Sequence, residues 1–179
     1  MLVRVRKVRR QLRAFFIGEK LGLRGGKHDP DYISVFPILP LMTVIFRHTL
    51  DVRFRDCDPM GHVNNAVYLT YLEQARFAHW REVWGINFER LPENTPGVIL
   101  ARAEIDYRRP AKYGDVLEIR IGLEKIGRTS FTYVYEVADQ EGRLVAGART
   151  VLVMYDYATA KPAPISDALR SKLGAPELS

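Results

Sequence analysis

The sequence holds a single cysteine, Cys57, among its 179 residues. One cysteine excludes a disulfide within the chain and is typical of a protein from a reducing compartment, so we expect a cytoplasmic location. No stretch of eighteen apolar residues occurs. The sequence therefore predicts no transmembrane helix and no integral membrane association.

Net charge is also missing from most of the chain. Residues 42–179 carry eighteen Lys or Arg and eighteen Asp or Glu side chains, so their formal charge is zero. The net charge of +6 comes entirely from residues 1–41, which hold nine basic and three acidic side chains. A nucleic-acid-binding core needs a basic surface of its own, so we expect no nucleic-acid partner.

The basic segment, residues 1–41, is predicted to lie outside the core. Its arginine-rich first half is compatible with an amphipathic helix for membrane-surface binding or targeting. We favour a poorly ordered tail, or an upstream stretch translated from a start before Met42. Residues 25–40 contain two adjacent glycines and three prolines, a composition typical of a linker.

Residues 42–179 are predicted to form one α+β domain. Apolar alternation predicts five strands, within residues 44–55, 99–107, 117–123, 131–137 and 144–154. Between the first two strands lies a helix of about five turns. It carries apolar residues on nearly all sides and is therefore expected to be buried. A loop around 92–97, turns at 126–129 and 140–142 and a serine-capped helix at 166–173 complete the pattern. This order favours one five-stranded antiparallel sheet wrapped around a long central helix.

Polar side chains suited to chemistry gather in residues 55–65, RDCDPMGHVNN. Asparagine is a preferred N-cap, so we expect Asn64 or Asn65 to open the long helix. Asp58 then lies one short loop before backbone N–H groups that have no intrahelical acceptor. A carboxylate beside such donors suits attack on a carbonyl, because the amides stabilise the oxyanion that forms.

Other residues of this stretch have competing interpretations. Asp56 is the rival carboxylate, but it lies farther from the helix start. His62 could orient a carbonyl or a water molecule, or it could be structural. Asn64 and Asn65 could serve as caps only. Cys57 has no evident paired base, so we do not expect it to be a nucleophile.

From Met42 onward the chain resembles the hotdog-fold acyl-CoA thioesterases, specifically the 4-hydroxybenzoyl-CoA thioesterase-like family. The resemblance covers residues 42–179 and leaves only the basic segment outside. The residues that match the family pattern are 55–65 with Tyr68 and Glu73, 107–110 with Gly114 and Asp115, the turn 127–130 and the tail 155–164.

The resemblance implies a single hotdog domain that hydrolyses an acyl-CoA thioester to free acid and CoA without a metal or redox cofactor. In the family, the acid at the position of Asp58 is the nucleophile or the general base, and the helix N-terminal amide, here near Asn65, is the oxyanion donor. His62 and Asn64 complete the candidate site. A sister branch takes its acid from the helix at Glu73, for which we expect a supporting role.

A CoA substrate brings phosphate groups, which require basic side chains at the pocket mouth. The candidates are Arg108, Arg109, Lys112, Lys125 and Arg128. An isolated hotdog leaves a sheet edge and half of its active site open, so the resemblance implies a homodimer and allows a homotetramer. Three alternatives stay open: a non-catalytic acyl-CoA-binding hotdog, an acyl-carrier-protein thioesterase, and a hydratase or dehydratase.

Overall fold

The computed structural model describes residues 42–85 and 97–173. The basic segment and nearly all of the loop predicted around 92–97 lie outside these residues. The assignment of residues 1–41 to an extension therefore stays a prediction.

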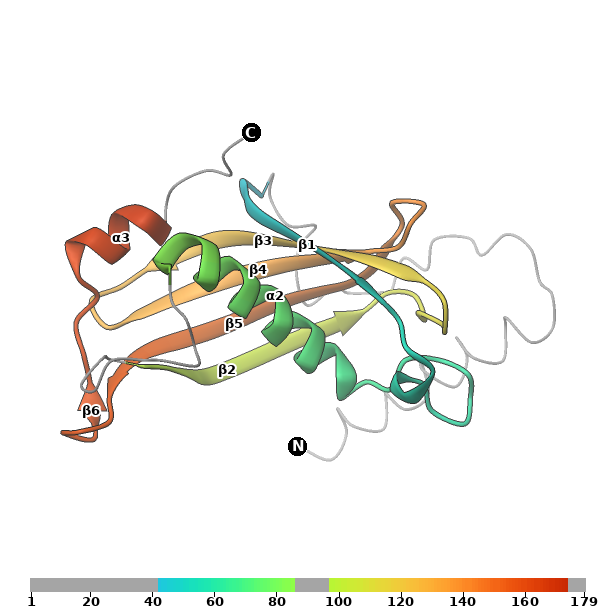
Figure 1. Cartoon of the computed structure of the whole chain (residues 1–179), viewed down its shortest axis with the longest axis horizontal. Coiled ribbons are helices and arrows are strands. Elements are labelled where there is room, and N and C mark those ends of the chain that lie inside the picture. The colour runs from blue at the N-terminus through green and yellow to red at the C-terminus, as the bar shows by residue number, and fades with distance from the viewer. Residues whose placement is uncertain (1–41, 86–96, 174–179) are drawn as a thin grey trace, which may run out of the picture. The chain divides into compact units, whose positions relative to one another are not determined.

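The described chain forms an antiparallel sheet with one long helix on its face (Figure 1). Five long strands follow the spatial order β1-β3-β4-β5-β2, so β1 and β2 are the two edges. A two-residue strand that the sequence did not predict pairs with the end of β5. The α+β class and the five-stranded sheet are thus confirmed. The strands are β1 (Val44–Asp51), β2 (Gly97–Tyr107), β3 (Val116–Ile126), β4 (Ser130–Ala138), β5 (Leu144–Asp156) and β6 (Lys161–Pro162).

Both predicted turns are present and have identifiable causes. At the β3–β4 hairpin, the Gly127 N–H donates to the carbonyl of Ser130 at 2.7 Å. At the β4–β5 turn, Gly142 has φ +75°, a backbone conformation that residues with a Cβ rarely adopt. The predicted C-terminal helix is α3 (Asp167–Leu173), and the hydroxyl of Ser166 accepts the Leu169 N–H at 3.2 Å. The serine cap is therefore confirmed.

The first strand ends earlier than predicted. Its ladder stops at Asp51, and a single 3-10 turn, η1 (Phe54–Asp56), follows. The Val52 N–H donates instead to the carbonyl of Asp115, in the loop before β3. Phe54 was predicted on the apolar face of the strand, but its side chain is 79% exposed. The turn redirects the chain toward the start of the helix.

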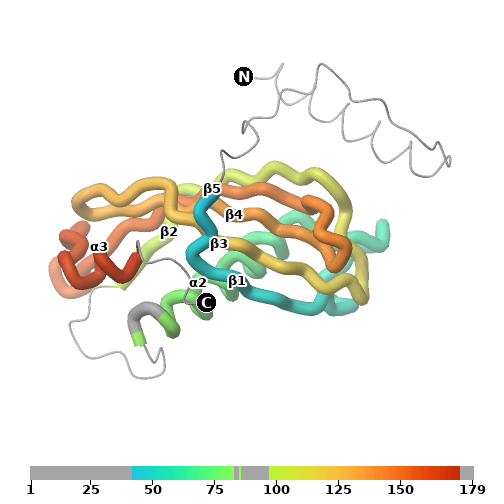
Figure 2. The backbone as a smooth tube through the Cα atoms, turned by 90° about the horizontal axis from the view of Figure 1, so that it is seen from above, coloured from blue at the N-terminus to red at the C-terminus, as the bar shows by residue number. Residues whose placement is uncertain are grey.

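The long helix is α2 (Val67–Trp84), and Figure 2 shows it on one face of the sheet. Tyr71, Leu72 and Ala75 are at most 1% exposed and pack on the sheet. Leu69 and Phe77 are only partly covered and remain 38% and 37% exposed. The expectation of a helix buried on all sides is therefore wrong for a single chain.

Two polar side chains lie on the buried face of α2. Arg76 is 3% exposed and His79 is 1% exposed. The His79 ring packs between Phe46 of β1, 5.1 Å away, and Tyr133 of β4, 5.7 Å away. Neither ring nitrogen of His79 bonds to another described residue. Burial lowers the pKa of His79 to about 4, so the ring is neutral in the folded protein.

The buried neutral histidine predicts a pH-dependent stability. Because the folded pKa lies below the unfolded value near 6.5, the unfolded state binds the proton first. The contribution of neutral His79 to the unfolding free energy is fully present above about pH 6.5. It is lost as the pH falls toward 4, by up to about 3 kcal/mol. Urea unfolding from pH 7 to pH 4.5 should show this slope, and His79→Phe should flatten it. An equal slope in the variant would contradict the assignment.

The predicted start of the core at Met42 generates a second prediction. Gly122 of β3 leaves room for the Met42 side chain, since a Cβ at Gly122 would lie 2.4 Å from Met42 Cγ. A chain that begins at Met42 should retain the unfolding free energy of the full chain within about 0.5 kcal/mol. Its turnover should also be unchanged. Insoluble protein on this truncation would show that residues 1–41 belong to the core or to an interface.

Candidate active site

The stretch from Cys57 to Val63 folds into a small closed loop. Cys57 and Val63 pair in an isolated antiparallel bridge. Inside it, the Asp58 N–H donates to the His62 carbonyl at 2.8 Å, and the Gly61 N–H donates to the Asp58 carbonyl at 2.9 Å. Gly61 has φ +81°, which only glycine adopts at little cost. The Pro-Met-Gly turn therefore fixes the backbone conformation next to Asp58.

The Asp58 carboxylate is half-buried at the mouth of this loop. One oxygen, Oδ1, accepts the N–H of Met60 at 2.9 Å. This local bond holds the side chain against its own turn. Among the described residues, the other oxygen receives no hydrogen bond, so it is available to a ligand.

The rival carboxylate, Asp56, is engaged on all sides. Its side chain is only 6% exposed. Oδ2 accepts the Tyr71 hydroxyl at 2.8 Å, the Arg53 Nε at 3.1 Å and the Arg53 backbone N–H at 3.2 Å. Burial raises the pKa of Asp56, but the bonds from Arg53 and Tyr71 outweigh it and hold the pKa below its ordinary value. Asp56 is therefore an ionised anchor inside the protein.

The helix start differs from the expectation. Ala66 is the N-cap residue of α2 and provides no side-chain cap, so neither Asn64 nor Asn65 occupies that position. Asn64 still accepts hydrogen bonds from two backbone amides at the helix start. Its Oδ1 accepts the Ala66 N–H and its carbonyl accepts the Val67 N–H, each at 2.9 Å. Two of the donors expected for an oxyanion are thus already used.

The amide of Asn65 is left for a ligand. Within residues 42–85 and 97–173, it donates to no acceptor. The Asn64 carbonyl of the same peptide accepts the Val67 N–H, and the Asn65 carbonyl on the following peptide accepts the Tyr107 hydroxyl at 2.9 Å. The Tyr107 ring in turn packs edge-on against Tyr68, with centroids 5.2 Å apart. The strand up to Tyr107 was expected to face Asp58 of a partner chain, and the contact of Tyr107 with Asn65 of the same chain was not predicted, because it spans 42 residues.

His62 and Glu73 lie at the edges of the candidate site. His62 is half-buried in the loop beside Asp58. The next residue, Val63, donates its N–H to the Ala111 carbonyl at 2.8 Å, which ties the loop to the segment between β2 and β3. Glu73 is exposed on α2, and its Oε1 lies 3.6 Å from Arg76 Nη2. That ion pair supports the expected structural role of Glu73.

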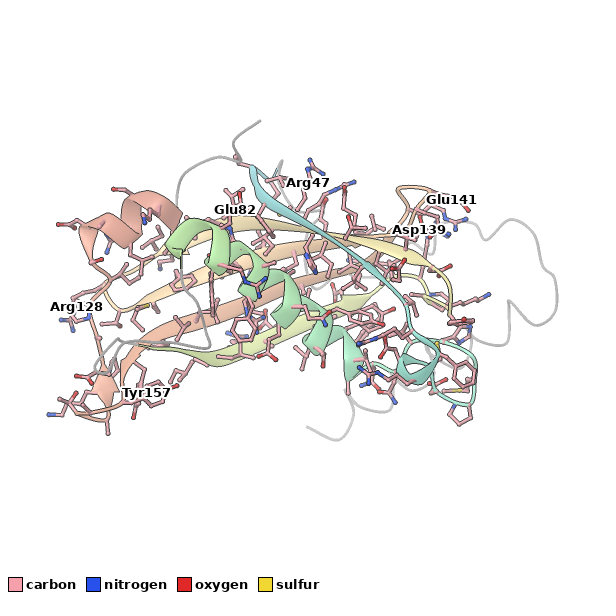
Figure 3. All side chains as sticks on the ribbon, viewed as in Figure 1. Arg47, Glu82, Arg128, Asp139, Glu141 and Tyr157 are labelled. Atoms are coloured by element: carbon pink, nitrogen blue, oxygen red, sulfur yellow. The ribbon has the colours of Figure 1, made fainter. Side chains whose placement is uncertain are left out.

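The predicted phosphate-binding residues fall into two groups. Arg108, Arg109 and Lys112 follow β2, at the end of the sheet where α2 begins. Arg108 is already engaged, because its Nη2 lies 3.3 Å from Asp106 Oδ2. Figure 3 shows Arg128 at the opposite end of the sheet, on the β3–β4 hairpin that also follows Lys125. One chain therefore does not bring all five together.

The part of the chain that the structure describes contains no group of three His, Cys, Asp or Glu side chains able to hold a metal ion. None of its helices combines the length and apolarity that a membrane crossing requires.

Residues 52–173 match the family model of the thioesterase-like superfamily. The chain belongs to this superfamily. The predicted recognition, the hotdog fold and the enzyme class, a thioester hydrolase, are thereby confirmed.

Relatives in this superfamily cover most of the core. The long-chain acyl-CoA thioesterase FadM of Escherichia coli K12 is 31% identical over 125 residues, which are 69% of this chain and 93% of FadM. The 1,4-dihydroxy-2-naphthoyl-CoA hydrolase of Synechococcus elongatus is 32% identical over 124 residues, 68% of this chain and 90% of that protein. A thioesterase from Thermus thermophilus, solved with coenzyme A and Zn, has a TM-score of 0.62 at 33% identity. That comparison covers 73% of this chain and 92% of the Thermus chain.

The anchoring of Asp56 gives a prediction about stability. Asp56→Asn should lower the unfolding free energy by about 1–3 kcal/mol, because Arg53 and Tyr71 lose a charged acceptor inside the protein. Asp51→Asn, at an exposed position on β1, is the matched control and should change it by less than about 0.5 kcal/mol. The Asp56 contribution should also fade as the pH falls through its lowered pKa. Equal losses in the two variants would contradict the anchor.

Proposed function

We propose that this protein hydrolyses acyl-CoA thioesters with Asp58 as the catalytic carboxylate. The observation that carries the proposal is the different hydrogen bonding of the two acids, Asp56 and Asp58. Asp56 is buried and bonded to Arg53 and Tyr71, whereas Asp58 keeps one oxygen open at the loop mouth. The acyl-CoA substrates of FadM and of the naphthoyl-CoA hydrolase support the substrate class.

Two routes from this geometry lead to the same products. As a general base, Asp58 takes a proton from water while the oxygen attacks the thioester carbon. As a nucleophile, its carboxylate attacks that carbon itself and forms a mixed anhydride, which water then hydrolyses. In both routes the carbon–sulfur bond breaks, and the CoA sulfur leaves as thiolate and takes up a proton.

The amide of Asn65 is the proposed oxyanion donor. It is unused within the described chain, and the bond from Tyr107 to the Asn65 carbonyl fixes the residue. A donor held in place before the reaction stabilises the developing charge without reorganisation. His62 and Asn64 shape the loop around this point, and we assign them positioning roles.

The two groups of basic residues support a site built from two chains. Strand β2 is an edge of the sheet, and the side chains of its middle part, residues 100–103, are exposed. Pairing two β2 edges antiparallel around a twofold axis would bring the end of one sheet to the opposite end of the other. Lys125 and Arg128 of one chain would then face Arg109 and Lys112 of its partner. We therefore propose a cytoplasmic homodimer, with the homotetramer as an extension.

The assignment of the acid is tested by paired variants. Asp58→Asn should lower kcat by at least about 10²-fold in an acyl-CoA thiol-release assay, with the unfolding free energy maintained. Asp56→Asn, compared under conditions where it is folded, should have the smaller effect on kcat. The reverse order would transfer the catalytic role to Asp56. Single turnover in ¹⁸O-labelled water detects the nucleophile route when water opens the mixed anhydride at the Asp58 carbon, because solvent oxygen then enters the Asp58 carboxylate and the product keeps an enzyme oxygen.

The assembly is tested by dilution and by mixing. Activity per chain should fall once the protein is diluted below the dimer dissociation constant. Inactive Asp58→Asn should regain turnover when it is mixed and refolded with an inactive variant of the partner wall, such as the double variant Lys125→Ala, Arg128→Ala. Hybrid dimers then contain one intact site. A fully active chain that sediments as a monomer at micromolar concentration would refute the two-chain site.

A further inference from the structure

A groove of about 550 Å³ runs between β1 and α2, at the sheet edge opposite to β2. Its volume lies within the range of small-molecule binding sites. The lining comes from the last residues of β1 and from one side of α2 between Tyr71 and Arg81. Ten helical residues at 1.5 Å each give the groove a length of roughly 15 Å. None of the candidate catalytic or phosphate-binding residues lines it.

The wall of the groove is apolar and its rim is charged. Leu50, Tyr71, Phe77 and Ala78 supply the apolar surface. Arg53 lies toward one end and Arg81 toward the other, whereas Asp51 is the one acidic lining residue. Arg81 is an exposed residue, and it forms no ion pair with another described residue. Arg53 is paired with Asp56, and Asp51 lies at the same end of the groove, so among the described residues Arg81 is the unpaired lining charge at the other end. An exposed guanidinium beside an apolar wall favours an anionic group on an apolar body.

We propose that the β1–α2 groove binds a long-chain carboxylate. The chain lies along the apolar wall between β1 and α2, and the carboxylate pairs with a guanidinium at the rim. Arg81 is the stronger partner, because Arg53 already donates to Asp56 through Nε at 3.1 Å. A guanidinium forms paired hydrogen bonds with a carboxylate, which gives the site selectivity over alcohols and amines of the same length.

The groove also contacts the support of the catalytic loop. Tyr71 and Arg53 both line it, and both bond to Asp56, which lies two residues before Asp58. With its carboxylate at Arg81, the ligand places the distal end of its chain against Tyr71, whose hydroxyl donates to Asp56. Occupancy of the groove therefore shifts the anchor of the loop and lowers kcat rather than raising KM. This second step rests on the proposed role of Asp58, whereas the binding itself does not.

Binding is tested on the full chain with dodecanoate as the probe, by titration calorimetry without any thioester present. Arg81→Ala should weaken dodecanoate binding about fivefold or more. Ala78→Trp should abolish it by filling the groove. The matched controls are Lys161→Ala, an exposed cation on β6, and Thr70→Trp, on the exposed side of α2, and both should bind as the parent does. Dodecylamine should bind at least about tenfold more weakly than dodecanoate.

Several results would overturn the proposal. Unchanged dodecanoate binding in both Ala78→Trp and Arg81→Ala would place the acid elsewhere, including the acyl-binding site. Equal affinity for dodecylamine would show that charge does not select the ligand. A smaller oligomer in Ala78→Trp, measured by sedimentation, would show that a second copy covers the groove. Absent binding with intact Asp58-dependent hydrolysis overturns this inference alone, and binding without hydrolysis overturns only the proposed function.

Discussion

The candidate site depends on the hydrogen bonds of the buried Asp56 carboxylate. The carboxylate joins Arg53 to the helix residue Tyr71, and the backbone carbonyl of Asp56 adds a third segment. Arg53, which follows β1, and Tyr71, one turn into α2, both donate to the carboxylate. The Asp56 carbonyl accepts the Asn64 N–H at 2.9 Å. A buried charge that loses its partners is costly, so the Arg53 and Tyr71 bonds stabilise the carboxylate in this position. Their geometry sets the position of the loop that carries Asp58.

Much of the fold follows from local patterns in the sequence. The alternation in β3, β4 and β5 predicts strands because each has one face on the core, and the two glycine-containing turns fix the hairpins between them. The polar cap at Ser166 is equally local. The strand before the loop was overextended, because the alternation continues through Phe54 while the backbone has already turned at η1. Sequence period alone does not report where a ladder ends.

The helix and the site show what a sequence pattern misses. Leu69 and Phe77 look like core residues but are only partly covered, whereas Arg76 and His79 look like surface residues but are buried. The burial of Asp56 could not be predicted, because its bond to Tyr71 joins residues fifteen apart and requires the helix to be in place. The Tyr107–Asn65 contact and the β1–α2 groove likewise exist only after the sheet has formed. The Asp58 loop was predictable because its Pro-Met-Gly turn is local.

The polar residues under α2 restrict how the helix can sit on the sheet. Trp80 of α2 donates to the Tyr133 hydroxyl of β4 at 3.4 Å, and Tyr71 of α2 donates to Asp56 at 2.8 Å. An all-apolar interface would tolerate sliding or rotation, since dispersion contacts are non-directional. Hydrogen-bonding side chains at fixed positions make a shifted register leave buried donors unsatisfied. The same register sets the groove wall through Ala78 and the loop anchor through Tyr71. The buried polar face of α2 therefore restricts both ends of the helix to one arrangement on the sheet.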